Sequence, residues 1–127
     1  MREQSGNNGS ASAEKSKQFA LRIIRLCRCL QTDKHEYVLA SQLLRSGTSI
    51  GANVREAGRG QSRADFYAKL TIALKEADET AYWLELLQES DSLEKALFDS
   101  LYSDCEELIR LLTAITKTIK ESENTDH

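Results

Sequence analysis

One segment of the chain repeats small and apolar residues at alternating steps of four and three positions. The series is Phe66, Leu70, Ala73, Ala77, Thr80, Leu84 and Leu87. A repeat that averages 3.5 residues keeps one face of an α-helix apolar and is typical of helices that pack at shallow angles. The segment therefore predicts a long helix with one buried face.

Three other segments, at 19–30, 43–57 and 97–119, carry the same alternation. The 127 residues include no proline, and no segment alternates apolar and polar residues with period two, so strands are not expected. Short connections make consecutive helices run antiparallel. The predicted fold class is all-α, an up-down-up-down antiparallel four-helix bundle. The expected core includes Phe66, Leu70, Leu84, Leu87, Leu101, Leu108 and Ile115.

Capping signals separate the four periodic segments. Asp33 with Glu36, Ser62 with Asp65 and Asp91 with Glu94 each place an acidic side chain three residues after a capping candidate. The segment Gly58-Arg59-Gly60 offers a glycine where a left-handed residue ends many helices.

The length and composition favour a single helical domain. The N-terminal residues 1–13 are rich in Gly, Ser and Asn and predict a disordered tail, 14–122 the bundle, and 123–127 a second disordered tail. The N-terminus has no apolar signal region, and no apolar run reaches the roughly 20 residues that span a bilayer. We therefore expect a cytoplasmic protein with no membrane partner and with reduced thiols.

The formal net charge of −3 is unevenly distributed along the chain. Residues 1–60 hold ten basic and five acidic residues, whereas 61–127 hold seven basic and fifteen acidic ones. Such asymmetry indicates a charged partner surface, unless the two halves compensate each other on folding. The basic excess is concentrated at Lys15, Lys17, Arg22, Arg25 and Arg28, which are candidates for a nucleic-acid or subunit contact.

The second periodic segment has an unusual centre, because two glycines lie inside a predicted helix. Each interior glycine costs about 1 kcal/mol relative to alanine, so close packing against another helix is expected to compensate. The alternative for the polar residues is that their side chains bond back to carbonyls of their own helix. The candidate helix-contact motif is Arg45, Ser46, Gly47, Ser49, Gly51, Asn53 and Glu56.

No catalytic, cofactor-binding or metal-binding group can be assembled from the sequence. His35 and His127 are the only histidines, and neither a Glu-x-x-His pair nor a His-Glu-x-x-His or paired Cys-x-x-Cys motif is present. Gly58-Arg59-Gly60 lacks the flanking pattern of a phosphate-binding loop. We expect a protein that is not an enzyme and that has no cofactor, metal ion or small-molecule substrate.

Two long stretches resemble a known family. QLLRSGTSIGANVREA at 42–57 and QSRADFYAKLTIALKEADETAYWLELL at 61–87 are similar to bacterial four-helix-bundle proteins encoded in intervening sequences of 23S ribosomal RNA genes, also labelled S23 ribosomal proteins. The resemblance covers about 15–120 and implies a homopentameric ring without catalytic activity. A related branch, the accessory variability determinant of diversity-generating retroelements, implies binding to RNA or DNA and to a reverse transcriptase.

Two functional hypotheses follow. In the first, the chain is a non-enzymatic homo-oligomeric scaffold or adaptor, and the basic half of one subunit meets the acidic half of the next. In the alternative, the basic cluster binds a phosphate backbone, and the chain is an accessory protein acting on structured RNA or beside a reverse transcriptase. The retroelement proteins are strongly basic, whereas this chain is acidic overall.

Overall fold

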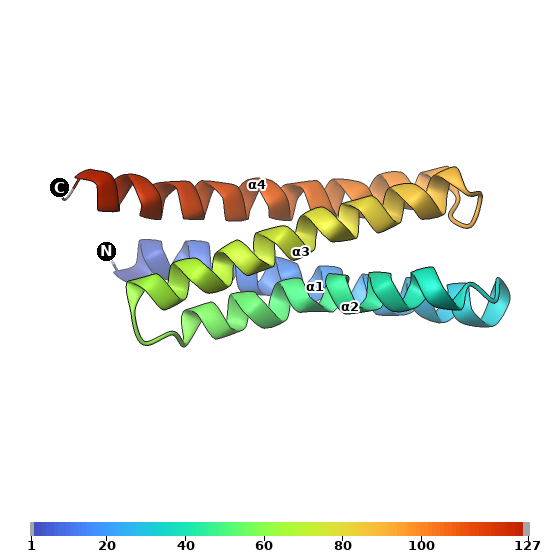
Figure 1. Ribbon diagram of the computed structural model, residues 1–127, viewed down its shortest axis with the longest axis horizontal. Coiled ribbons are helices and arrows are strands. Elements are labelled where there is room, and N and C mark those ends of the chain that lie inside the picture. Colours follow the sequence, from blue (N-terminus) through green and yellow to red (C-terminus); the bar gives the residue numbers. More distant parts are fainter. Residues whose placement is uncertain (1, 126–127) are drawn as a thin grey trace.

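The computed structural model describes the backbone of residues 2–125 and the side chains of residues 11–122. Within this range it contains four α-helices and no strand (Figure 1). The helices are α1 (Arg2–Asp33), α2 (Tyr37–Gly58), α3 (Arg63–Glu89) and α4 (Lys95–Thr125). The all-α class predicted from the sequence is confirmed.

Each helix packs against two others. α1 contacts α2 and α4, and α3 contacts the same two helices, so α1 and α3 lie at opposite corners of the fold. The turn 59–62 lies at the end of the molecule that carries both chain ends, whereas the turns 34–36 and 90–94 lie at the other end (Figure 1). α1 and α3 therefore point towards the same end.

The core consists of apolar side chains from all four helices. Five of the seven predicted core residues, Leu70, Leu84, Leu87, Leu101 and Leu108, are buried. The other two residues were predicted to be buried but are only partly buried, and they pack against the edge of the core. They are Phe66 and Ile115.

The two exceptions have local causes. Phe66 lies in the first turn of α3, where the helix has only begun to contact its neighbours. A strict 3.5-residue repeat drifts by about 20° per heptad around a straight α-helix. Ile115 therefore lies at the edge of the buried face, where the neighbouring Thr116 is buried instead, while Ile119 in the same series is buried.

The outer helices are longer than the predicted domain boundaries. α1 begins at Arg2 rather than at residue 14, and α4 continues to Thr125 rather than ending at 122. Poor intrinsic helix formers suggested a disordered tail over 1–13, but Ser12 is only 1% exposed and Ser16 is completely buried. Packing on the rest of the fold therefore supports α1 from at least Ser12 onward, whereas residues 126–127 lie outside the described part.

Only one of the three predicted capping pairs forms a side-chain cap that the structure describes. The Oγ atom of Ser62 accepts a hydrogen bond from the backbone N–H of Asp65 at 3.0 Å, so α3 starts as predicted. Asp33 is instead the last residue of α1, and α2 begins after Glu36, whose side chain makes no capping hydrogen bond. The prediction was wrong there because α1 continues through the expected break.

The residues with left-handed backbone conformation in the turns differ from the predicted glycine. No described glycine has positive φ, and the residue after Gly58 has φ −109°. The left-handed positions are His35 at φ 55° and Asp91 at φ 67°. Asp91 therefore forms the turn rather than a helix cap, since a short polar side chain tolerates this conformation better than most.

Candidate interaction surfaces

The glycines of α2 allow close contact with α1. A Cβ atom on Gly47 would lie 2.9 Å from Cγ2 of Ile23, and a Cβ on Gly51 would lie 3.3 Å from Oγ of Ser16. Real Cβ atoms essentially never approach another heavy atom to 2.9 Å. The close approach of the two helices at Gly47 therefore requires glycine, and the packing offsets its low helix propensity.

Ser46 precedes Gly47 by one residue, about 100° around α2, and its side chain contacts α3. Its side chain is fully buried, and its Oγ atom shares a 2.8 Å hydrogen bond with Oγ1 of Thr80. The Thr80 hydroxyl also donates to the carbonyl of Glu76 at 2.7 Å. The two buried hydroxyls thus satisfy each other across the α2–α3 contact.

Two other polar residues of the motif bond to their own helix. The Ser49 hydroxyl donates to the Arg45 carbonyl at 2.7 Å, and Nδ2 of Asn53 donates to the Ser49 carbonyl at 2.9 Å. Both alternatives for this segment therefore occur in it. Gly47, Gly51 and Ser46 contact neighbouring helices, whereas Ser49 and Asn53 follow the local pattern.

Charged residues line the outer edge of the α2–α3 contact. Glu56 pairs with Lys69 at 2.7 Å, and Arg45 lies 3.9 Å from Glu79. All four side chains are at least a third exposed, so each pair contributes less than about 1 kcal/mol. Oε1 of Glu76 is buried and has no hydrogen-bond partner among the described residues.

Folding divides the basic cluster of α1 into two groups. Nζ of Lys15 lies 3.0 Å from Glu107, and the Arg22 guanidinium donates to Asp104 at 2.7 Å. Both acidic residues belong to α4. The charges of these two cations are therefore neutralised within the same molecule by carboxylates from the acidic second half of the chain.

The remaining three cations form an exposed stripe on α1. Lys17, Arg25 and Arg28 are exposed and make no ion pair with any described residue. Leu21 lies between them in the sequence and is 37% exposed. We call Lys17, Leu21, Arg25 and Arg28 the basic stripe.

Carboxylates gather along the α3–α4 side of the fold. Asp78 and Glu106 are exposed and make no described ion pair, while Glu85 accepts a 2.5 Å hydrogen bond from the Tyr102 hydroxyl. That hydrogen bond, followed by burial and the charges of Glu85 and Glu106, raises the pKa of Tyr102 to about 12. Three carboxylates on this side, those of Asp78, Glu85 and Glu106, thus make no ion pair with any described residue.

The three cysteines differ in their exposure. Cys27 and Cys105 are buried, whereas Cys29 is exposed, and all three are free thiols. Burial raises the pKa of Cys27 to about 11. Burial, followed by the charges of Asp78, Glu106 and Asp104, raises the pKa of Cys105 to about 12.

We expect one thiol to react with iodoacetamide in the native protein at pH 8. The thiolate is the nucleophile, and the two buried thiols remain protonated at this pH. Mass spectrometry of the native protein should find one modified cysteine, Cys29, and three after unfolding in urea. A Cys29→Ser variant is the control and should remain unmodified when native, whereas equal labelling of all three thiols without urea would contradict the assigned burial.

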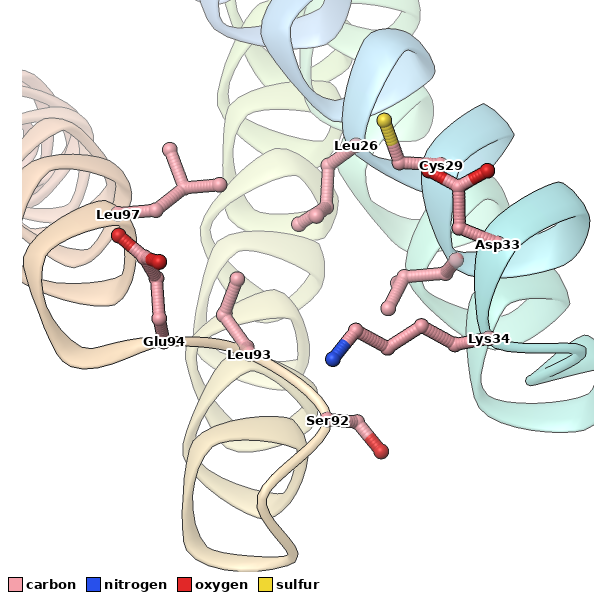
Figure 2. Close-up of a pocket in the computed structure, with 9 residues that line it drawn as sticks. Leu26, Cys29, Asp33, Lys34, Ser92, Leu93, Glu94 and Leu97 are labelled. Carbon is pink, nitrogen blue, oxygen red and sulfur yellow. The ribbon is translucent and has the colours of Figure 1, made fainter.

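A cavity of about 200 Å³ opens between the end of α1 and the turn 90–94. Figure 2 shows side chains from both segments around it. Its lining is Leu26, Cys29, Leu30, Asp33, Lys34, Ser92, Leu93, Glu94 and Leu97. This cavity could not be predicted from the sequence, because its two walls are about sixty positions apart along the chain and meet only through folding.

Two kinds of feature are absent from the part of the chain that the structure describes. Its residues contain no group of three His, Cys, Asp or Glu side chains that could hold a metal ion. None of its helices has an apolar stretch of the length required to cross a membrane.

Comparisons with known proteins place this arrangement beside one family. The sequence model of the 23S rRNA-intervening sequence proteins matches residues 10–114. A crystal structure of a protein of unknown function from the S23 ribosomal protein family of Bacteroides thetaiotaomicron is 48% identical, with a TM-score of 0.85. The alignment covers 87% of this chain and 98% of that one. The comparison with curated proteins finds no match.

Proposed function

The chain belongs to the 23S rRNA-intervening sequence protein family, and from this premise we propose that it is a non-enzymatic, homo-oligomeric scaffold or adaptor. In this proposal each subunit is an up-down-up-down antiparallel four-helix bundle. Five subunits form a closed ring in the cytoplasm. The ring presents repeated copies of one helical surface to its partners.

The observation that carries the proposal is the charge left over after folding. Two cations of α1 are paired with α4, but the three of the basic stripe are exposed and make no ion pair with a described residue. On the α3–α4 side, the exposed carboxylates of Asp78 and Glu106 have no cationic partner among residues 11–122. A molecule with two separate surfaces of opposite charge is complementary to a second copy of itself, and such unlike contacts generate rings when the rotation closes.

The alternative function is binding to structured RNA or DNA, alone or beside a reverse transcriptase. The basic stripe supports it, because clustered Lys and Arg neutralise phosphates and release counterions. Folding weakens this alternative, since Lys15 and Arg22 are already paired with carboxylates of α4. If only the three cations of the basic stripe contact phosphates, a plot of the logarithm of the RNA association constant against the logarithm of the salt concentration should have a slope of only about −2 to −3.

Light scattering combined with an RNA titration tests the proposal. We expect purified protein at micromolar concentration to have the mass of five chains of 14.3 kDa, with or without added RNA. Fluorescence anisotropy of a labelled hairpin RNA should remain unchanged at both 50 mM and 200 mM salt. A single-chain mass would refute the scaffold, and salt-dependent RNA binding by that monomer would favour the alternative.

A further inference from the structure

Building on the proposed self-association, we infer that the basic stripe on α1 of one copy docks in parallel along α3 of the next copy. The receiving surface is an acidic stripe on the outside of α3. It consists of Asp78, Tyr82, Glu85 and Glu89. This pairing rests on the proposed function and names the two helix faces that meet.

The two stripes have matching spacings. Leu21, Arg25 and Arg28 follow Lys17 by four, eight and eleven residues, and Tyr82, Glu85 and Glu89 follow Asp78 by four, seven and eleven. Steps of three and four keep residues on one face of a helix. Eleven residues correspond to about 16.5 Å at 1.5 Å per residue, so the terminal cations and the terminal carboxylates lie equally far apart.

Both stripes are available for contact. The terminal charges Lys17, Arg28, Asp78 and Glu89 are all exposed and without an ion pair among the described residues. The second residue of each stripe has a large, partly apolar side chain that is exposed. The exposed fraction is 37% for Leu21 and 53% for Tyr82. Docking would bury this pair between the charges, which is the usual arrangement of an apolar centre and a polar rim.

The stripes cannot meet within one chain. α1 and α3 lie at opposite corners of the fold, because each packs against α2 and α4. Their outer faces therefore point away from each other. A contact between the two stripes joins unlike surfaces of two copies, which is the head-to-tail arrangement of rings and filaments.

The relative height of the stripes favours a ring. Lys15 and Arg22 of α1 contact Glu107 and Asp104 of α4, and Sγ of Cys105 donates to the carbonyl of Ala77 on α3 at 3.3 Å. The first residue of each stripe, Lys17 on α1 and Asp78 on α3, therefore lies beside the same segment of α4 along the bundle axis. Because α1 and α3 also point towards the same end (Figure 1), a rotation about an axis parallel to the helices pairs the stripes without a shift along that axis. A rotation without such a shift closes into a ring.

Charge reversal in the full chain tests the pairing of the stripes. The α1 variant is Lys17→Glu with Arg28→Glu, and the α3 variant is Asp78→Lys with Glu89→Lys. Each places like charges opposite one another, so light scattering should show a fivefold drop from the wild-type mass to that of one chain. The four-substitution variant that combines both reversals restores complementarity and should recover the wild-type mass.

Matched controls separate a loss of docking from a loss of folding. Arg55→Glu with Arg110→Glu changes the net charge by the same amount as the α1 variant, at two exposed positions outside both stripes, and should leave the mass unchanged. Circular dichroism should give the wild-type helix content for every variant, because the reversed residues make no described ion pair.

Three results would overturn the pairing. If the wild type is an oligomer and both double variants keep its mass, the stripes are not the contact, while the scaffold proposal stands. If both double variants dissociate but the combined variant does not recover, the stripes do not face each other. If the wild type is a monomer, both the proposed function and this inference fail.

Discussion

Replacing Gly47 by valine is expected to lower the free energy of unfolding by about 3 kcal/mol, which is the upper part of the range for overpacked cores. The new Cβ would lie 2.9 Å from Cγ2 and 3.1 Å from Cγ1 of Ile23. Ile23 is fully buried and cannot turn towards solvent, so α1 and α2 must separate. Urea denaturation followed by circular dichroism measures this loss directly.

A glycine on the same helix provides the control. A Cβ atom added to Gly58 would have no atom within 4 Å, and the residue does not have positive φ, so Gly58→Ala should be neutral or stabilise by up to about 1 kcal/mol. In the double variant Gly47→Val with Ile23→Ala, the smaller alanine leaves room for the added valine side chain. The double variant should be more stable than the sum of the two single effects predicts. Additive losses would show that Gly47 and Ile23 are not in contact.

Truncation of Leu84 to alanine is expected to cost about 2–5 kcal/mol. Leu84 is 0% exposed and belongs to the periodic series on α3. Removing its buried methyl groups leaves a cavity that the surrounding helices can fill only in part. Thermal or urea unfolding should show the loss as a lower transition midpoint with an unchanged denaturant slope.

Leu97 is the matched control for this truncation. It is 38% exposed and lines the open cavity near the turn 90–94, so Leu97→Ala should cost less than about 1 kcal/mol. Equal losses for the two leucines would mean that burial in α3 does not determine the stability of the fold.

The periodic residues of α3 show how far local pattern extends. The repeat correctly predicted burial of Leu70, Leu84 and Leu87, because the phase of a helix face depends only on the spacing of its own residues. The Ser62 cap was also predictable, since its hydrogen bond joins positions three residues apart. The caps at Asp33 and Asp91 were not, because α1 continues to Asp33 and because Asp91 takes a left-handed conformation in the turn.

The candidate surfaces show the opposite case. Five cations on α1 are similar in the sequence, yet the structure pairs Lys15 and Arg22 with α4 and leaves Lys17 exposed on the outer face. The glycines of α2 indicated a close contact, but nothing in their spacing identified Ile23 as the neighbour of Gly47. Such contacts depend on the positions of residues on other helices.

The amino-acid sequence by itself determined the all-α class, the four helices and the polarity of charge between the two halves of the chain. These properties follow from the spacing and composition of residues along the polypeptide chain. Only the tertiary structure decided which charges neutralise one another and which remain on the surface. The physical reason is that an ion pair depends on a distance of a few ångströms between side chains more than eighty residues apart, as between Arg22 and Asp104. The net charge of −3 therefore describes the whole chain, whereas its capacity for contact depends on the stripes that folding leaves unpaired.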